Sequence, residues 1–371
     1  MLDSFFDAGS SHSARIVDHA AAPKPQSPTP ISRNTSKPPP PVRNSTRPNV
    51  QPVSIPPSGA SGHKASEADS FSQYFSRSTS WASDPTWFVW DKLPPGQQPN
   101  PPPLKDSQTA LRSLSWSSHG AQRLLDGVVV FEDLSIGWYH LSWHVSAPNN
   151  CTREAAWAPP PPPWIGDDLR TASEMYGDLV ASFAERAMHQ RRHVGRGECW
   201  DLANESLREI ANTQQGVLPK VMPCIAHTHG HLIFTGVAGQ MGTWKGGDDT
   251  VRRGDIVQWL NVKIKLVGQP LATMTLGNPD HTAIVVSDSY IPSLTAGSNA
   301  SEEGQALHPS AIGSLDVIEQ SVHELPSRRV YDMRQFLSGE VWIYRPMPME
   351  LYLGMAEVAA VWPPPASAVR V

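Results

Sequence analysis

Proline is the residue whose distribution most constrains how this chain can fold. The sequence has 371 residues and 37 prolines, more than half of them before residue 105 and a second cluster at 159–163. The first third also offers few aliphatic side chains to offset the entropy cost of ordering its backbone. We therefore predict a disordered Ser/Pro-rich tail over residues 1–80, a tryptophan- and proline-rich arm over 81–126, and a folded domain that begins near residue 127.

The tail contains a short motif that is typical of ligands for SH3 domains. In the segment "SKPPPPVRN", Pro38, Pro41 and Arg43 form the pattern P-x-x-P-x-R. Such a segment pre-forms a polyproline II helix, so it loses little entropy when it docks in an aromatic groove, and the arginine can pair with an acidic rim. We expect SH3-domain proteins as partners; a solvated, proline-rich spacer is the alternative.

The arm carries large aromatic side chains that a free linker would not need. They are Trp81, Trp87, Phe88 and Trp90. Exposed apolar groups of this size usually mark a contact surface. We expect these residues to dock on the folded domain, and a motif that binds another protein is the alternative.

Charge and cysteine content narrow the classes of protein. The net charge of -5 is mild and gives no footprint for nucleic acid. The three cysteines, Cys151, Cys199 and Cys224, are too few for a disulfide framework and favour a reduced compartment. The first residues lack a signal-peptide pattern, and no apolar run reaches the roughly 18 residues of a membrane span. We expect a cytoplasmic protein without a cofactor or a membrane span.

The spacing of apolar residues changes from helical to extended along the second half of the chain. It predicts one helix over 168–189 and a second from Cys199 to Asn212. β-branched runs predict at least one strand within 127–145 and further strands at 254–267, 281–290, 314–322 and 340–346. Helices followed by successive strands indicate an α+β domain with an antiparallel sheet over 127–347. A C-terminal tail follows at 348–371, in which we predict a short helix.

Cys199 is the candidate nucleophile because it lies at the start of the second predicted helix. Backbone N–H groups at a helix start favour an anion, and so favour the reactive thiolate. Gly195 and Gly197 let the backbone approach a substrate closely. Glu198 opposes this, since an adjacent negative charge disfavours a thiolate unless it points away. A buried, inert thiol on an apolar helical face is the alternative.

His281 is the candidate base, because we predict it as the first residue of a strand that continues into the apolar run "AIVV". Glu319 and Gln320, on the next predicted strand, are the candidates for the residue that orients its ring. They alternate faces, so only one of them can point at His281. Glu319 would stabilise an imidazolium more strongly than Gln320. Each residue alone also has a structural interpretation, a solvated or packed histidine and a glutamate that faces water.

These residues lie in four segments, "GECWDLA", "RRGDIVQW", "DHTAIVV" and "LDVIEQ". Together the segments resemble the papain-like CHAP and NlpC-type amidase and peptidase domains. The resemblance implies a papain-like cysteine-proteinase fold, with two helices packed on a small antiparallel sheet. It also implies Cys199 as nucleophile, His281 as base and Glu319, or Gln320, as the orienting residue.

A longer set of segments is similar to one fungal domain. The tryptophan–proline arm, "GWYHLSWHV", "GECWDLANE" and "DHTAIV" cover roughly residues 80–347. They resemble the cysteine-proteinase-fold domain found at the C-terminus of the myosin tail region-interacting protein of cortical actin patches and in an altered-inheritance-of-mitochondria protein. The resemblance implies a scaffold that meets SH3 domains and actin-assembly factors at cortical patches. An active thiol peptidase or amidase is the alternative function.

A histidine cluster is a second place where a site could form. The segment "AHTHGHLIF" places His227, His229 and His231 at alternate positions, with Cys224 near. Imidazole and thiolate groups are zinc ligands. This spacing on an extended strand spreads the ligands too widely for one tetrahedral ion, so we predict an exposed polar face and no metal site.

Overall fold

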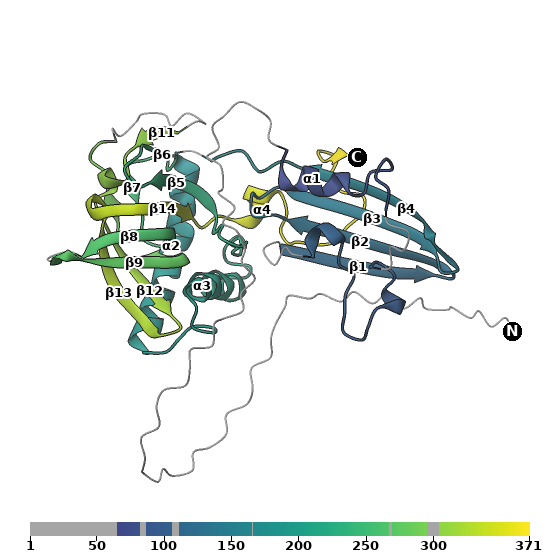
Figure 1. The fold of residues 1–371 in the computed structure, drawn as a ribbon, viewed down its shortest axis with the longest axis horizontal. Helices are drawn as coiled ribbons and strands as arrows, with labels where there is room; N and C mark the ends of the chain where they lie inside the picture. The colour runs from purple at the N-terminus through teal and green to yellow at the C-terminus, as the bar shows by residue number, and fades with distance from the viewer. Residues whose placement is uncertain (1–64, 82–86, 106–110, 165, 267–268, 295–303) are drawn as a thin grey trace, which may run out of the picture.

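The computed structural model describes residues 65–81, 87–105, 111–164, 166–266, 269–294 and 304–371. The SH3-ligand motif at Pro38, Pro41 and Arg43 lies outside these residues. The described chain forms two units that lie side by side (Figure 1). One is a long antiparallel sheet, and the other is a larger antiparallel sheet with two helices on it.

The first sheet is a meander of successive hairpins. Its strands are β1 (Leu111–His119), β2 (Gln122–Val130), β3 (Ile136–His144) and β4 (Ala147–Ala158), and β15 (Val369–Arg370) from the C-terminus pairs with β4. The first hairpin turns at Gly120, whose φ of 59° is a conformation that glycine adopts without steric cost. The sheet begins at residue 111, inside the segment that we predicted as an arm.

The aromatic arm covers one face of this sheet. Helix α1 (Glu67–Gln73) and the residues that follow it form a cluster with the inward-facing side chains of β2, β3 and β4. Phe88 is fully buried, with its ring centroid 4.8 Å from that of Trp143. Phe75 stacks on Tyr139 at 4.7 Å. The predicted docking is therefore confirmed for the described aromatic residues of the arm, since apolar burial offsets the cost of ordering them.

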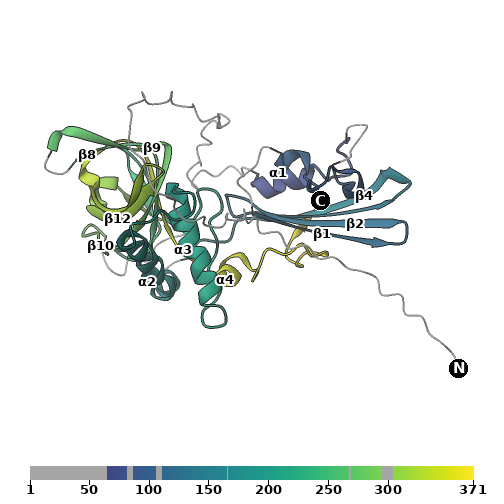
Figure 2. The same ribbon diagram turned by 90° about the horizontal axis from the view of Figure 1, so that it is seen from below.

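The C-terminal segment packs on the opposite face. His140, which alternates with the arm-facing residues of β3, stacks on Trp362 with 5.5 Å between ring centroids. Before this contact the chain forms the short helix α4 (Met349–Leu353), as predicted for the tail. Both faces of the first sheet are thus covered (Figure 2).

The second sheet is antiparallel and has the order β11-β6-β5-β14-β8-β9-β12-β13. Its strands are β5 (His231–Val237), β6 (Gly242–Trp244), β8 (Ile256–Leu266), β9 (Gln269–Val285), β11 (Gln305–Leu307), β12 (Ser314–Ser321), β13 (Glu324–Asp332) and β14 (Phe336–Arg345). A separate two-stranded ribbon joins β7 (Thr250–Val251) to β10 (Ser289–Tyr290).

Helices α2 (Asp167–His189) and α3 (Cys199–Thr213) cover one face of the second sheet (Figures 1 and 2). Alternate strand residues pack against them, among them Ile256, Ile284 and Ile318. The residues between them, such as Val257, Val285 and Val317, enter a second core on the other side. The predicted class, two helices on an antiparallel sheet, is confirmed, and both helices have nearly the predicted bounds.

Strand β9 is much longer than predicted. We expected a strand that begins at His281, but β9 begins at Gln269 and forms a long hairpin with β8. Leu260 of β8 pairs with Asp280, and Val262 pairs with Leu276. Three residues of β9, 277–279, therefore lie opposite the single residue Asn261 and form a bulge. Bulges re-aim the side chains that follow them, and His281 follows this one directly. The apolar pattern marked only the part of β9 that enters the core.

Candidate active site

Cys199 is the first residue of helix α3, and the preceding loop is folded back onto the first turn. Gly195 and Gly197 both have positive φ, 60° and 89°, which lets the loop curl. The carboxylate of Asp201 accepts a hydrogen bond from the backbone N–H of Arg196 at 2.6 Å. A side chain on Gly195 would lie 2.8 Å from that carboxylate, so the close approach requires glycine there.

The sheet holds the same loop from the other side. The Gln320 amide nitrogen donates to the carbonyl oxygens of Val194 and Glu198, at 2.9 and 2.8 Å, and its oxygen accepts from the N–H of Val194 at 3.0 Å. Gln320 is 2% exposed, so these bonds satisfy a buried amide. They fix the carbonyl of the residue directly before Cys199. Gln320 therefore supports the nucleophile loop, and it is not the residue that contacts His281.

Glu319 is the residue that contacts the histidine. Its Oε2 lies 3.0 Å from Nε2 of His281. Strands β9 and β12 pair Val285 with Val317 and Ile284 with Ile318, which puts Glu319 and His281 diagonally opposite on one face. Nε2 is engaged by the carboxylate, so Nδ1 is the ring nitrogen left to face Cys199, whose thiol is one of the groups that raise the pKa of His281.

The surroundings of His281 favour its charged form. Burial alone would lower the pKa of His281, but its hydrogen bonds to Cys199 and Glu319, with their negative charge, outweigh burial and raise the pKa to about 10. At neutral pH the ring is an imidazolium. The structure thus brings together Cys199, His281 and Glu319, whereas the Cys199 side chain is only partly buried.

A loop at residues 225–230 forms a wall beside this site. The indole N–H of Trp200 donates to the carbonyl oxygen of Ala226 at 2.6 Å. Next to it, His227 lies between two carboxylates, with Nδ1 2.9 Å from Glu132, in the turn between β2 and β3, and Nε2 3.7 Å from Asp280. The two units therefore meet at the residue next to His281. Neither contact was predictable from spacing in the sequence.

The three histidines of the cluster point to three different places. His227 contacts Glu132, His229 contacts Cys224 and Gln258, and His231 contacts the hydroxyl of Tyr352. His229 and His231 are buried, at 0% and 2% exposure, so the predicted exposed face is wrong. Alternation failed because the chain turns between Ile225 and Thr228, and strand β5 starts only at His231. The described residues contain no group of side chains that could hold a metal ion.

Cys224 and His229 make a second thiol–imidazole contact, 3.0 Å from Sγ to Nδ1. Burial lowers the pKa of His229 to about 4 and raises the pKa of Cys224. The oxygen of Gln258 accepts from the Thr282 hydroxyl at 2.7 Å and lies 3.1 Å from Nε2 of His229. Since that oxygen can only accept, Nε2 carries the proton and Nδ1 accepts from the thiol. This is a neutral pair.

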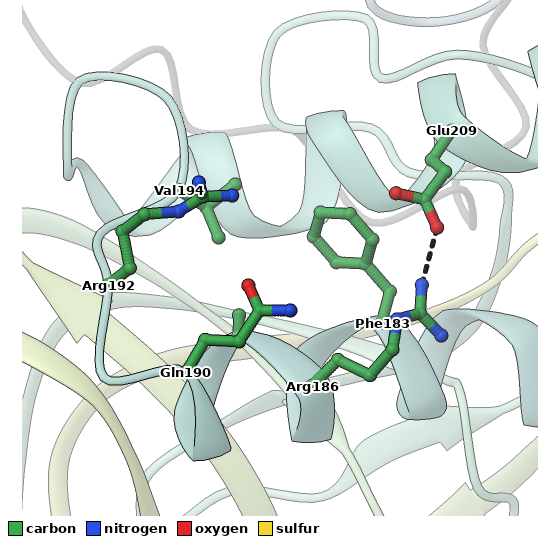
Figure 3. Close-up of a pocket in the computed structure, with 7 residues that line it drawn as sticks. Phe183, Arg186, Gln190, Arg192, Val194 and Glu209 are labelled. Carbon is green, nitrogen blue, oxygen red and sulfur yellow. Dashed lines mark hydrogen bonds and ion pairs between the residues drawn. The ribbon is translucent and has the colours of Figure 1, made fainter.

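A shallow hollow of about 400 Å³ lies between α2, α3 and the loop that leads to Cys199 (Figure 3). Its walls are Phe183, Arg186, Ala187, Gln190, Arg192, Val194 and Glu209. Arg186 is paired with Glu209 across it. Val194, whose backbone Gln320 holds, is one of the lining residues. No helix in the described ranges is both long and apolar enough to cross a bilayer.

Comparison with known proteins places this domain in a family. The chain is 28% identical over 230 residues to altered inheritance of mitochondria protein 3 of Debaryomyces hansenii. The alignment covers 58% of this chain and 21% of that protein, so the chain spans about a fifth of the relative's length. No solved structure matches. Residues 152–357, which contain Cys199, His281 and Glu319, match the AIM3/BBC1 cysteine proteinase-fold domain. Because this match covers more than half of the chain, the protein belongs to the AIM3/BBC1 cysteine proteinase-fold family.

Proposed function

We propose that this domain is a thiol hydrolase that cleaves peptide or isopeptide amide bonds, with the papain-like order of nucleophile, base and orienting residue. The observation that carries the proposal is the chain of contacts from Cys199 through His281 to Glu319. An imidazolium beside the thiol favours the thiolate, which is the reactive form of cysteine.

The geometry supports a two-step reaction. The Cys199 sulfur attacks the amide carbon, an S–C bond forms, and the carbonyl electron pair moves to oxygen. His281 gives its proton to the amide nitrogen, the C–N bond breaks, and the amine leaves. His281 then takes a proton from water, whose oxygen attacks the thioester carbon; the S–C bond breaks and releases the acid and the thiolate.

The start of helix α3 offers the donors for the developing oxyanion. The first amides of a helix have no acceptor within the helix, and they point out of its N-terminal end. In α3 the first two are the amides of Cys199 and Trp200. Amides fixed in this way stabilise the oxygen charge of a tetrahedral intermediate. Gln320, by holding the carbonyl of Glu198, supports their orientation.

The first test is labelling of Cys199 by iodoacetamide, followed by peptide mass spectrometry. We expect labelling at pH 6 to be at least about tenfold faster than in the unfolded chain, since an imidazolium beside a thiol favours the reactive thiolate. His281→Ala removes the acceleration, whereas Cys151→Ser, which removes a thiol whose pKa burial raises to about 11, leaves it unchanged. Equal rates in the folded and unfolded chains would refute the hydrolase.

A second proposal is that the chain also acts as an interaction protein in the cytoplasm, at cortical actin patches. Its support is membership of the AIM3/BBC1 family together with the P-x-x-P-x-R motif at Pro38, Pro41 and Arg43. In this proposal the Ser/Pro-rich part of the tail, which carries the motif, recruits SH3-domain proteins, and the folded residues that follow it carry the enzyme site.

The interaction proposal is tested separately from the chemistry. Pull-down of SH3 domains by the full chain is compared with pull-down by a chain in which residues 38–43 are deleted. Loss of binding on deletion is expected, and Cys199→Ser is the matched control that leaves binding intact. Unchanged binding by the deleted chain would contradict the role of the tail.

A further inference from the structure

Tyr331 lies beside the candidate site, on a strand that sequence reasoning did not single out. It belongs to β13, whose register pairs Tyr331 with Leu315 and Ser327 with Glu319. Tyr331 and Glu319 therefore project from the same face of neighbouring strands. The tyrosine side chain reaches along this face, and its hydroxyl donates to Oε1 of Glu319 at 2.7 Å.

This contact completes the hydrogen bonding of the Glu319 carboxylate. Oε2 lies 3.0 Å from Nε2 of His281, and Oε1 accepts from Tyr331. The side chain of Glu319 is only 8% exposed, so solvent has little access to replace either partner. Nε of Arg329 lies 3.9 Å from Oε1, which is beyond hydrogen-bonding distance.

The surroundings of Tyr331 leave its hydroxyl as a donor to the carboxylate. Burial, and then the charge of Glu319, raise the pKa of Tyr331, so the phenol keeps its proton. Its ring packs edge-on against Trp259, 5.8 Å between centroids, and Trp259 is the cross-strand neighbour of His281. The sulfur of Met274 lies 3.4 Å from the hydroxyl and is a weaker acceptor than the carboxylate.

We propose that Tyr331 is a positioning residue for the candidate reaction: it holds the Glu319 carboxylate so that Oε2 stays on Nε2 of His281 and the ring keeps its orientation. This inference rests on the proposed function of the site. A carboxylate with one bonded oxygen can rotate about its last torsion, whereas one with both oxygens bonded cannot. Hydrogen bonds to the charged form of an acid also favour that form.

The test replaces only the hydroxyl. In Tyr331→Phe the Glu319 carboxylate loses a donor, so it holds the imidazolium of His281 less firmly. We expect the pH profile of iodoacetamide alkylation of Cys199 to change, and the rate at pH 6 to fall about tenfold, as expected for one hydrogen bond to a charged group.

A spectroscopic measurement makes the test independent of thiol reactivity. Proton NMR of the full chain follows the Nε2–H signal of His281, which lies far downfield when a carboxylate accepts from it. We expect this signal to move upfield or broaden in Tyr331→Phe. Tyr352→Phe is the matched control, because it removes a buried hydroxyl bonded to another histidine, His231, at 2.9 Å.

The outcomes separate the inference from the function on which it rests. An unmoved Nε2–H signal together with an unmoved alkylation profile in Tyr331→Phe would overturn the positioning role. An equal change in Tyr352→Phe would also overturn it, because the effect would then be one of general packing. By contrast, a wild-type Cys199 that reacts no faster than an unfolded thiol refutes the hydrolase, while the NMR comparison still decides the role of Tyr331.

Discussion

The domain contains two thiol–imidazole pairs, and they differ in what the second ring nitrogen contacts. In the pair Cys199–His281 that nitrogen meets the carboxylate of Glu319 at 3.0 Å, and in the pair Cys224–His229 it meets the amide oxygen of Gln258 at 3.1 Å. The first arrangement raises the histidine pKa to about 10, and burial of the second lowers it to about 4.

The comparison shows that a cysteine near a histidine is not by itself a reactive site. Burial disfavours the charged form of both rings and so acts to lower the pKa of each histidine. Only the pair with a buried negative charge next to it overcomes that cost. The other pair stays neutral, with the thiol donating to the ring, and serves the packing between the sheet and α3.

The largest expected effect comes from making the first pair resemble the second. Glu319→Gln keeps the shape of the side chain and removes its charge, so His281 loses the group that favours the imidazolium. We expect the rate of Cys199 alkylation at pH 6 to fall about 10²- to 10⁴-fold, in line with the loss of an orienting carboxylate in other triads. A fall of less than about threefold would show that the charge of Glu319 is not needed.

The reciprocal change tests the second pair. Gln258→Glu places a carboxylate in a position where the wild-type amide is fully buried beside His229. The new carboxylate would have to accept hydrogen bonds from both the Thr282 hydroxyl and the His229 ring, in a core with little solvent. We expect a loss of about 3 kcal/mol in the free energy of unfolding at pH 8, measured with urea. A variant as stable as the wild type would contradict the neutral description of this pair.

The two rings also predict opposite contributions to stability as the pH changes. The pKa of His229 falls from 6.5 to about 4 on folding, so its contribution is present above pH 6.5 and is lost as the pH falls toward 4. The pKa of His281 rises from 6.5 to about 10, so its contribution is present below pH 6.5 and is lost as the pH rises through 10.

Urea unfolding of His229→Gln across this range measures the first contribution. The wild type should lose up to about 3 kcal/mol more than the variant between pH 7 and pH 4, since each pKa unit is worth about 1.4 kcal/mol. His281→Gln is the matched control, and it should change the slope above pH 8 and leave the acid range unaltered. Parallel curves for the wild type and His229→Gln would contradict the assignment.

The smallest of these effects concerns the support of the nucleophile loop. Gln320→Leu removes the three hydrogen bonds to Val194 and Glu198 while keeping most of the side-chain volume. We expect about a tenfold loss in the rate of Cys199 alkylation, because the first turn of α3 is less well fixed. The acid-side midpoint should stay in place, since Gln320 does not contact His281. A shift of that midpoint would contradict this, because it would show that Gln320 acts on the His281 ring.

The sequence predicted the parts of this molecule that depend on local periodicity. The apolar spacing predicted α2 and α3 within two residues of their observed ends, and alternation along β12 correctly required that only one of Glu319 and Gln320 reach His281. The choice between them depends on strand register and facing, which no local pattern contains.

The missed features arise from contacts between distant segments. The proline-rich composition hid α1 and β1, because a few aromatic residues there are ordered by burial against the first sheet. A bulge around Gly277 hid the length of β9. Tyr331 was missed because its hydroxyl reaches a residue four positions along from its cross-strand partner, a distance at which pairing rules predict nothing.

The most direct test of the central claim compares the two cysteines in one sample. The native chain is treated with a limiting amount of iodoacetamide at pH 6, and the label on each cysteine peptide is quantified by mass spectrometry. The thiolate–imidazolium description predicts at least about a hundredfold preference for Cys199 over Cys224, because only the first thiol is paired with a charged ring and partly exposed. Because the imidazolium depends on the charge of Glu319, we expect Glu319→Gln to remove most of this preference. Labelling of Cys199 that is no faster than that of an unfolded peptide, and unaffected by Glu319→Gln, would contradict the account.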